Sequence, residues 1–290
     1  MIWGETMRFD AYKASLPTGT DAEQVINYLA LHNPAGELVE GRPRFGYEAL
    51  TSLRDEEGER WADVLHGGSN GILIEVSGEG TPPLVDLIRH QWPGHACTRA
   101  DVCQDIIEDE RGLFSRITPR LDDLVRAHGR VKARGIIPRV RPDEGATYTI
   151  GSRASETYFR VYQKPEQLVA EGLGHRSLRV FFDRWVRVEL EAKPQKDNRY
   201  RAATFQPEEF FGLSRIARGV CDEILATAVE KTSAIDYKKI TTRQRQRRVL
   251  LKQWGNVLED WKEEVGSWAE VGIAQRELLE ELRREKNRGR

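Results

Sequence analysis

Long hydrophobic runs, clustered cysteines and paired histidines are missing from this chain of 290 residues. No stretch of about 18 consecutive apolar residues occurs, so we expect no membrane-spanning helix. The three cysteines are too few and too scattered for a disulfide framework or a zinc site, which favours a reducing, cytoplasmic compartment. The first residues do not combine a basic region with an apolar one, so we expect no secretory signal.

Sequence signatures of two common enzyme classes are missing as well. The chain has neither a glycine-rich Walker loop nor a Gly-x-Ser-x-Gly elbow, so ATP-driven and serine-hydrolase chemistry lack support. The formal net charge is −1, and overall charge therefore does not indicate a nucleic-acid binder. Only the local distribution of charge can argue for one.

The residues that are present predict two regions. Charged residues make up 31% of the chain and hydrophobic residues 39%, which is enough for a folded core under a polar surface. Strand-like and helix-like segments alternate over residues 1–215 and predict an α+β domain. The pattern over residues 216–290 is helical, first basic and then amphipathic.

Residues 158–164 carry the most informative pattern. Their β-prone composition, followed by a proline, predicts a strand in which successive side chains point to opposite faces. One face would carry two phenols and two cations, Tyr158, Arg160, Tyr162 and Lys164. A phenol beside fixed cations can act as a nucleophile toward a phosphodiester, because the cations hold the phosphate.

Two more predicted strands present carboxylates with the same alternation. Residues 99–105 carry Asp101 and Asp105 on one face, and residues 185–193 carry Glu189 and Glu191 on one face. Asp101 and Asp105 would lie about 13 Å apart along a straight strand, so we expect the strand to end and turn at Asp105. Carboxylate oxygens suit Mg²⁺ or Mn²⁺ rather than zinc, and such an ion can polarise a phosphate oxygen.

Each pattern also has a reading without catalysis. Charged residues that alternate along a strand are typical of the solvent-facing side of an antiparallel sheet. Cross-strand pairs of cations with glutamates would explain residues 187–193, and the tyrosines would fit an amphipathic sheet. What favours a shared site is the coincidence of three such strands, one with phenols and cations and two with carboxylates.

Two basic segments and a tryptophan repeat lie outside these strands. Residues 130–141 carry five arginines or lysines, and residues 237–252 carry seven with no acid. Each segment is either a phosphate-contacting surface or a solvated face. Trp254, Trp261 and Trp268 recur every seven residues, which predicts an apolar helical seam rather than a base-stacking platform.

Four motifs together resemble the replication initiation factor family, which includes rolling-circle initiators of plasmids and replication proteins of filamentous phages and prophages. The family pattern is Arg-x-Asp-x-x-x-Asp, Tyr-x-Gly-Ser-Arg-x-Ser, Arg-x-Tyr-x-Lys and Arg-x-Glu-x-Glu-x-Lys. These motifs stand at residues 99–105, 149–155, 160–164 and 187–193. One departure is visible, because the tyrosine of the second motif is displaced to Tyr148 and Thr149 takes its place.

The resemblance implies a metal-dependent, site-specific single-strand DNA nickase and strand transferase. A tyrosine would attack a phosphodiester at the origin, form a 5′-phosphotyrosyl link and free a 3′-OH, so that the strand could later be resealed without ATP. Tyr162 is the predicted nucleophile, flanked by Arg160 and Lys164, with Tyr158 as first reserve and Tyr148 as second. The fold implied is an antiparallel sheet with helices packed on one face, as in relaxase-type nickases, plus the C-terminal helical region.

The resemblance also implies ligands and partners. The metal, Mg²⁺ or Mn²⁺, would be bound by Asp101, Asp105 and Glu189, with Glu191 a weaker candidate. Phosphate would be bound by Arg153, Arg187 and Lys193. Single-stranded or cruciform origin DNA is the expected partner in a bacterial cytoplasm, and a host replicative helicase and a second copy of the chain are further candidates. The alternatives are a non-catalytic DNA-binding regulator on the same scaffold and a metal-dependent nuclease that uses water.

Overall fold

The structure is a computed structural model that describes residues 3–4, 6–68, 71–128, 134–138, 145–170, 172, 176–225 and 257–288. The chain divides into two compact units, Met1–Ala234 and Ile235–Arg290. The first unit contains every strand of the described residues, and each unit is considered by itself below.

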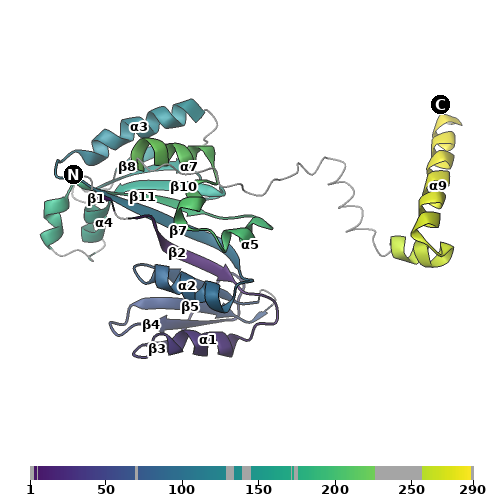
Figure 1. The fold of residues 1–290 in the computed structure, drawn as a ribbon, viewed down its shortest axis with the longest axis horizontal. Coiled ribbons are helices and arrows are strands. Elements are labelled where there is room, and N and C mark those ends of the chain that lie inside the picture. The colour runs from purple at the N-terminus through teal and green to yellow at the C-terminus, as the bar shows by residue number, and fades with distance from the viewer. Residues whose placement is uncertain are drawn as a thin grey trace. The chain divides into compact units, whose positions relative to one another are not determined.

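The first unit is built on one eleven-stranded sheet, whose strands pair antiparallel throughout (Figure 1). The strand order is β3-β4-β5-β6-β2-β7-β11-β10-β9-β8, and β1 also pairs with β7. The strands are β1 (Trp3–Gly4), β2 (Arg8–Ser15), β3 (Glu37–Gly41), β4 (Ala49–Arg54), β5 (Arg60–His66), β6 (Leu73–Ser77), β7 (Ala96–Ile107), β8 (Arg134–Pro138), β9 (Ala146–Gly151), β10 (Thr157–Gln163) and β11 (Trp185–Ala192).

Helices surround this sheet in the first unit. They are α1 (Ala22–Leu31), α2 (Thr81–Gln91), α3 (Leu113–His128), α4 (Lys164–Ala170), the 3₁₀-helix η3 (Arg176–Phe181), α5 (Asn198–Ala202), α6 (Pro207–Phe211), α7 (Arg215–Val220) and the π-helical turn η4 (Cys221–Leu225). Of these, α1, α2, α3, α6 and α7 contribute side chains to the core on the apolar face of the sheet. Figure 1 shows α1 beside β4 and β5 and α3 beside α7, while α2 packs against β2 and β6. One buried cluster joins Val25 of α1, Ile88 of α2 and Leu121 of α3 to Tyr12 and Val188 of the sheet. This confirms the predicted α+β architecture.

Local sequence signals place the helices. Asp21 caps α1 by accepting a hydrogen bond from the Gln24 N–H at 3.0 Å. Val25 and Leu29, four residues apart, form the buried stripe of this helix. The helix α2 begins with prolines in its first turn, where a missing N–H leaves no hydrogen bond unmade. Pro119 lies inside α3 and does not end it.

One edge of the sheet was not expected from the sequence. The strands β3, β4 and β5 extend it beyond β6. The side chains of β3 are mostly exposed, so this edge strand lacks the buried alternation that reveals a strand in a sequence.

A β-bulge interrupts β2 at Asp10. Phe9 pairs with Val102 of β7 and Ala11 pairs with the next residue, Asp101, so Asp10 is an extra residue without a partner on β7. The Asp10 carbonyl instead accepts hydrogen bonds from the Gly78 N–H at 2.8 Å and the Thr81 hydroxyl at 3.1 Å. Bulges re-aim side chains, and this bulge directs the Asp10 carboxylate to the polar face of the sheet.

The described part of the second unit contains two helical segments, residues 257–265 and α9 (Trp268–Arg288). Gly266, with φ of +94°, separates them in a conformation that glycine adopts readily. The Trp268 side chain is 53% exposed, so the expected apolar seam does not bury it. Trp254, residues 237–252 and most of residues 130–141 lie outside the described residues. Among the helices described, none is long and apolar enough to cross a membrane.

Candidate active site on the polar face of the sheet

Alternation along three neighbouring strands creates a charged face opposite the helices. Val102, Val161 and Val188, one from each of β7, β10 and β11, lie in the hydrophobic core. The residues between them point the other way, and their charged members are buried, Asp101, Asp105, Arg187, Glu189 and Glu191. Buried charges require partners, and the following contacts supply them.

Tyr162, Glu189 and Arg160 form the centre of this face. The Tyr162 hydroxyl donates a hydrogen bond to Glu189 Oε2 at 3.1 Å, and Arg160 forms an ion pair with the other oxygen, Oε1. Register explains the contacts, because Arg160 lies directly opposite Glu189 on the neighbouring strand. The sequence-predicted nucleophile, one predicted cation and one predicted metal ligand are therefore brought together.

A cavity of about 210 Å³ opens beside this centre. It is lined by Asp10, Thr147, Arg160, Tyr162, Lys164, Gln167 and Glu189. Lys164 is the first residue of α4 rather than part of β10, yet its ammonium lies 5.9 Å from the centre of the Tyr162 ring and donates to Gln167 Oε1 at 3.0 Å. The helix start turns Lys164 toward the same cavity as Tyr162.

A second cavity, of about 270 Å³, adjoins the first along the polar face. Its lining includes Asp10, Lys13, Glu75, Arg99, Asp101, Arg160 and Glu189. Asp10, Arg160 and Glu189 line both cavities. The two cavities are therefore neighbouring parts of one polar site with carboxylates and cations on its walls.

Burial and like charge shift the titration of the central groups. Burial, together with the carboxylates of Asp101 and Asp10, raises the pKa of Glu189 despite its ion pair with Arg160. Burial likewise raises the pKa of Asp101, against the effect of Arg99. The pKa of Tyr162, which is 7% exposed, is raised by burial and by the Glu189 carboxylate. Tyr162 is therefore protonated in this arrangement and needs a base to become a nucleophile.

Asp105 occupies a different environment from Asp101. β7 continues through Asp105 to Ile107, so the expectation of a strand end there was wrong. Arg187, opposite Asp105 in register, donates from Nε to Oδ1 and from Nη2 to Oδ2, both at 2.8 Å. Arg8 donates to Oδ2 at 2.8 Å. Burial alone would raise the pKa of Asp105, but these hydrogen bonds lower it.

Arg187 also links this pair to the central site. Its Nη1 donates to Asp10 Oδ1 at 2.9 Å. The three hydrogen bonds from its guanidinium to Asp105 and Asp10 all end on carboxylate oxygens. The Arg187 side chain is only 6% exposed, so it lies beneath the site and does not face solvent. Among the predicted phosphate-binding residues it is the one most fully engaged inside the protein.

Glu191, Arg99 and Lys193 form a second group of ion pairs. Arg99 holds both oxygens of Asp101, at 2.7 and 2.5 Å, and lies 2.9 Å from Glu191 Oε2. Lys193 lies 2.5 Å from Glu191 Oε1. Burial would raise the pKa of Glu191, but the nearby charges of Lys193 and Arg99 outweigh burial and lower it. Arg153, in the turn after β9, is exposed, and Lys193 donates to its carbonyl.

The three candidate tyrosines lie in different places. Tyr148 pairs with core-facing Val161 and donates to Asp122 of α3 at 2.8 Å, so it lies on the helix-covered face. Tyr158 is on the polar face but lines neither cavity, and its ring lies 5.9 Å from the Arg153 guanidinium carbon. Of the three tyrosines, only Tyr162 lines one of the two polar-face cavities, and it does so together with the Glu189 carboxylate and the Arg160 cation.

The carboxylate oxygens of the site are the kind of ligand that hard divalent cations prefer. Asp10, Asp101 and Glu189 offer only oxygen donors, and their mutual repulsion contributes to the raised Glu189 pKa, which a cation would relieve. As placed, no three His, Cys, Asp or Glu side chains in the described part of the chain form a ready metal site. Arg99 and Arg160 occupy the ligand oxygens instead.

Two features of the site escaped the sequence analysis. Asp10 was not assigned to the site, because the bulge that re-aims it follows from pairing with β7. Lys13 and Glu75, which come from strands far apart in the chain, were likewise given no role in the site. One signal for these residues was available in the sequence, the alternation of polar residues with core residues along Arg8, Asp10 and Lys13. The bulge breaks the period of this alternation.

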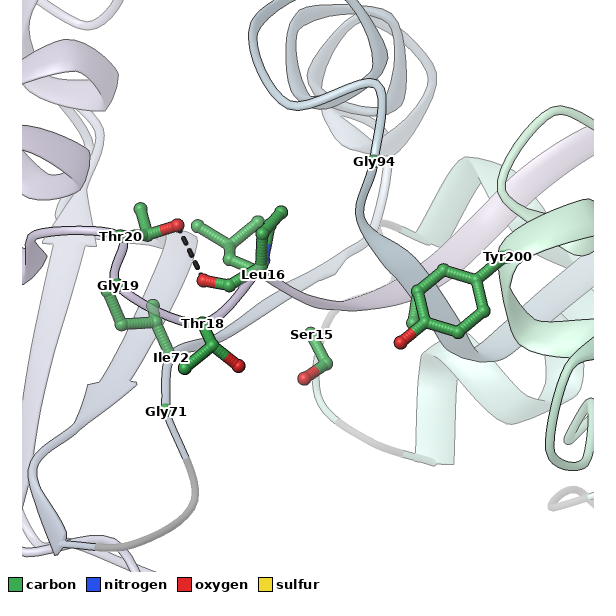
Figure 2. Close-up of a pocket in the computed structure, with 11 residues that line it drawn as sticks. Ser15, Leu16, Thr18, Gly19, Thr20, Gly71, Ile72, Gly94 and Tyr200 are labelled. Carbon is green, nitrogen blue, oxygen red and sulfur yellow. Dashed lines mark hydrogen bonds between the residues drawn. The ribbon is translucent and has the colours of Figure 1, made fainter. Parts of the chain in front are cut away.

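A further cavity lies at the other end of β2 and differs in chemistry. Figure 2 shows it between Ser15, Thr18, Gly71, Gly94 and Tyr200, with the Thr18 and Tyr200 hydroxyls directed toward the open space. Its volume is about 250 Å³, and its lining side chains carry no charge. Without a base or a cation, this cavity lacks the groups that phosphoryl transfer needs.

Comparison with known proteins shows the fold and the family of this chain. The chain is similar in fold to a rolling circle replication initiator protein from Geobacillus stearothermophilus, with a TM-score of 0.50 and 19% identity over 75% of this chain and 84% of that one. No curated protein matches the sequence. Residues 96–265, more than half of the chain, match the replication initiation factor family, and this match includes β7, β10 and β11. The resemblance of the four motifs is thereby confirmed, and the chain belongs to the replication initiation factor family.

Proposed function

We propose that this protein initiates rolling-circle DNA replication by nicking single-stranded origin DNA, with Tyr162 as the nucleophile. The observation that carries the proposal is the hydrogen bond from the Tyr162 hydroxyl to Glu189, in a cavity lined also by Arg160 and Lys164. A hydroxyl nucleophile, a base that accepts its proton and cations that hold a phosphate are the components of transesterification at a phosphodiester. The family supports the initiator role.

In the proposed reaction, Tyr162 Oη attacks the phosphorus while its proton passes to Glu189 Oε2. The bond between phosphorus and the 3′-oxygen breaks, the phosphate stays on the 5′ side as a phosphotyrosyl ester, and the departing oxygen takes a proton to become a 3′-OH. No ester bond is lost, so a 3′-OH can reverse the reaction without ATP. Since the Tyr162 pKa is raised, transfer to Glu189 is the step that makes the oxygen nucleophilic.

The cations around Tyr162 would hold the scissile phosphate. Arg160 lines the cavity and its side chain is 31% exposed, so its guanidinium would be within reach of a bound phosphate. Lys164 adds a positive charge beside the Tyr162 ring. Fixed positive groups next to the reacting phosphate would stabilise the charge that develops in the transition state.

A divalent cation, Mg²⁺ or Mn²⁺, belongs to this proposal. Asp10, Asp101 and Glu189 would hold it, and when bound it would offset negative charge on the phosphate oxygens. Asp105 is left out of the proposed ligand set, because both of its oxygens accept hydrogen bonds from guanidinium groups. Single-stranded or cruciform origin DNA is the proposed partner, while a host helicase and a homodimer stay predictions.

A covalent-capture experiment tests the proposal. The protein is incubated with 3′-labelled, random-sequence single-stranded DNA and Mg²⁺ or Mn²⁺, and the products are separated under denaturing conditions. We expect label attached to protein for the wild type and for Tyr158→Phe, and none for Tyr162→Phe. Sequencing the captured DNA would give the preferred site.

The other outcomes separate the alternatives. Cleavage without an adduct would point to a nuclease that uses water. Binding that weakens steeply with salt, without any cleavage, would point to a DNA-binding regulator. An adduct that survives in Tyr162→Phe and disappears in Tyr158→Phe would move the nucleophile to Tyr158.

A further inference from the structure

Phe45 is an exposed aromatic residue held in an unusual conformation beside the polar site. Its side chain is 62% exposed and its φ is +58°. Gly46, which follows, has φ of +80°, and the Tyr47 N–H donates to the Arg44 carbonyl at 3.1 Å. Phe45 and Gly46 are therefore the two central residues of a tight turn with positive φ at both positions, where Asn or Gly is the usual first residue.

A bulky residue at positive φ is strained, and the residue preference of this turn does not favour phenylalanine. The left-handed conformation is unfavourable by roughly 1–2 kcal/mol for residues other than glycine. An exposed phenyl ring recovers little of this by burial. Strain of this kind persists where the surroundings enforce it, and it concentrates at binding sites.

The surroundings do fix the turn. Arg44 reaches into the polar face, where it forms ion pairs with Asp63, at 2.6 Å, and with Glu75. On the other side of Phe45, Tyr47 packs against the small cluster of Leu50, Leu65 and Leu73. The ring is thus carried by an anchored turn rather than by a free loop.

The ring also stands next to the proposed site. The Lys13 ammonium lies 4.8 Å from the centre of the Phe45 ring, and the Arg44 guanidinium carbon lies 5.7 Å from it. Lys13 and Glu75 line the same cavity as Asp101 and Glu189. An aromatic ring with cations beside it, at the margin of a cavity suited to a phosphodiester, matches the way proteins bind single strands.

We propose that Phe45 stacks against a nucleobase of the single-stranded DNA that enters the site, while Lys13 contacts the adjoining phosphate. The proposal rests on the proposed function, since it takes the bound molecule to be single-stranded DNA. Stacking uses the π-face that every base has, so it holds the strand without selecting its sequence. Phe45 would then be a positioning residue that fixes the strand relative to Tyr162.

Two single-stranded probes of equal phosphate number isolate the stacking. One is an oligothymidylate of about 20 nucleotides, longer than a typical single-strand site, and the other is a fully abasic strand of the same length. Phe45→Leu should weaken binding of oligothymidylate by about 5-fold to 150-fold, the range for one stacked base. It should leave binding of the abasic strand unchanged. Leucine meets the same steric penalty at this φ, so the comparison changes the ring and not the backbone.

Matched variants serve as controls for the effect of Phe45→Leu on binding. Phe45→Trp should retain the preference for the strand with bases, and Phe181→Leu, at another exposed phenylalanine of the first unit, should leave both affinities unchanged. Lys13→Gln should weaken both strands alike and reduce the slope of log affinity against log salt by about 1, as expected for a phosphate contact.

The outcomes distinguish this inference from the proposed function. Equal oligothymidylate affinity in the wild type and Phe45→Leu, with Tyr162-dependent adduct formation intact, would overturn the stacking alone. Equal losses on both strands would also overturn it, because the effect would not depend on bases. Failure of the wild type to bind or cleave any single-stranded DNA would overturn both.

Discussion

Replacing Asp105 by asparagine should destabilise the first unit strongly, whether or not metal is present. The Asp105 side chain is 0% exposed and accepts three hydrogen bonds at 2.8 Å from Arg187 and Arg8. Asparagine keeps the shape but removes the charge and turns an amide N–H₂ toward a guanidinium donor. Breaking a buried ion pair on one side costs about 3–5 kcal/mol, a large part of a typical total stability of about 5–15 kcal/mol.

Urea unfolding in chelator, followed by circular dichroism, measures this change. The matched control is Asp123→Asn, because Asp123 pairs with Arg126 at 3.0 Å with side chains 76% and 67% exposed. That change should lower the free energy of unfolding by less than about 1 kcal/mol. Since the Asp105 pKa is lowered by folding, its contribution should be fully present above the ordinary value of 3.8 and fade as pH falls below it.

One result would refute this reasoning. If Asp105→Asn lowers the free energy of unfolding in chelator no more than Asp123→Asn does, then the pairing of Asp105 with Arg187 and Arg8 contributes little to stability.

Three further predictions concern the Glu189 carboxylate, the turn at Gly151 and the divalent cation. Because burial, Asp101 and Asp10 raise the Glu189 pKa, the single-turnover nicking rate should fall on acidification at a pH above the ordinary value of 4.5, and a rate unchanged in Glu189→Gln would exclude Glu189 as the base. Gly151, with φ of +90°, would place a new Cβ 3.1 Å from the Thr157 carbonyl, so Gly151→Ala should lower the free energy of unfolding by about 1–2 kcal/mol. The matched control is Gly94→Ala, where φ lies outside the left-handed region and the new Cβ would come no closer than 3.7 Å to Pro17, so the change should be about a few tenths of a kcal/mol. Equal melting temperatures for these two variants would contradict that. Chelation of divalent ions should abolish adduct formation and leave the unfolding curve nearly unchanged, since Arg99 and Arg160 already neutralise Asp101 and Glu189; a large loss of stability in chelator would mean that the metal is structural.

The strands of the site could be predicted because each one alternates. In β10, Phe159 and Val161 enter the core while Arg160 and Tyr162 face the other way, and the period of two alone shows this. The same holds for Glu189 on β11. Which of these charges would meet in space depends on register between strands, and the sequence shows no register.

The contacts of Asp10 and Asp105 could not be predicted from strand alternation. The carboxylate of Asp10 reaches the site through a bulge that exists only when β2 pairs with β7. Asp105 shares the face of Asp101 along β7, but Arg187 lies opposite Asp105 and donates hydrogen bonds to both of its oxygens. Strand alternation assigns a residue to a face, whereas its partners come from neighbours that are distant in the chain.

The ion pairs of the polar face have a consequence for how two ligands would bind. Arg99 and Arg160 act as internal counter-ions to Asp101 and Glu189. A divalent cation that binds these carboxylates would release guanidinium groups, and a phosphate would bind the groups released. Each ligand would thus replace the counter-ion that the other displaces, so metal and DNA should each raise the affinity for the other by the same factor. Each carboxylate and each guanidinium of this face would then have a partner of opposite charge both with the two ligands bound and with neither.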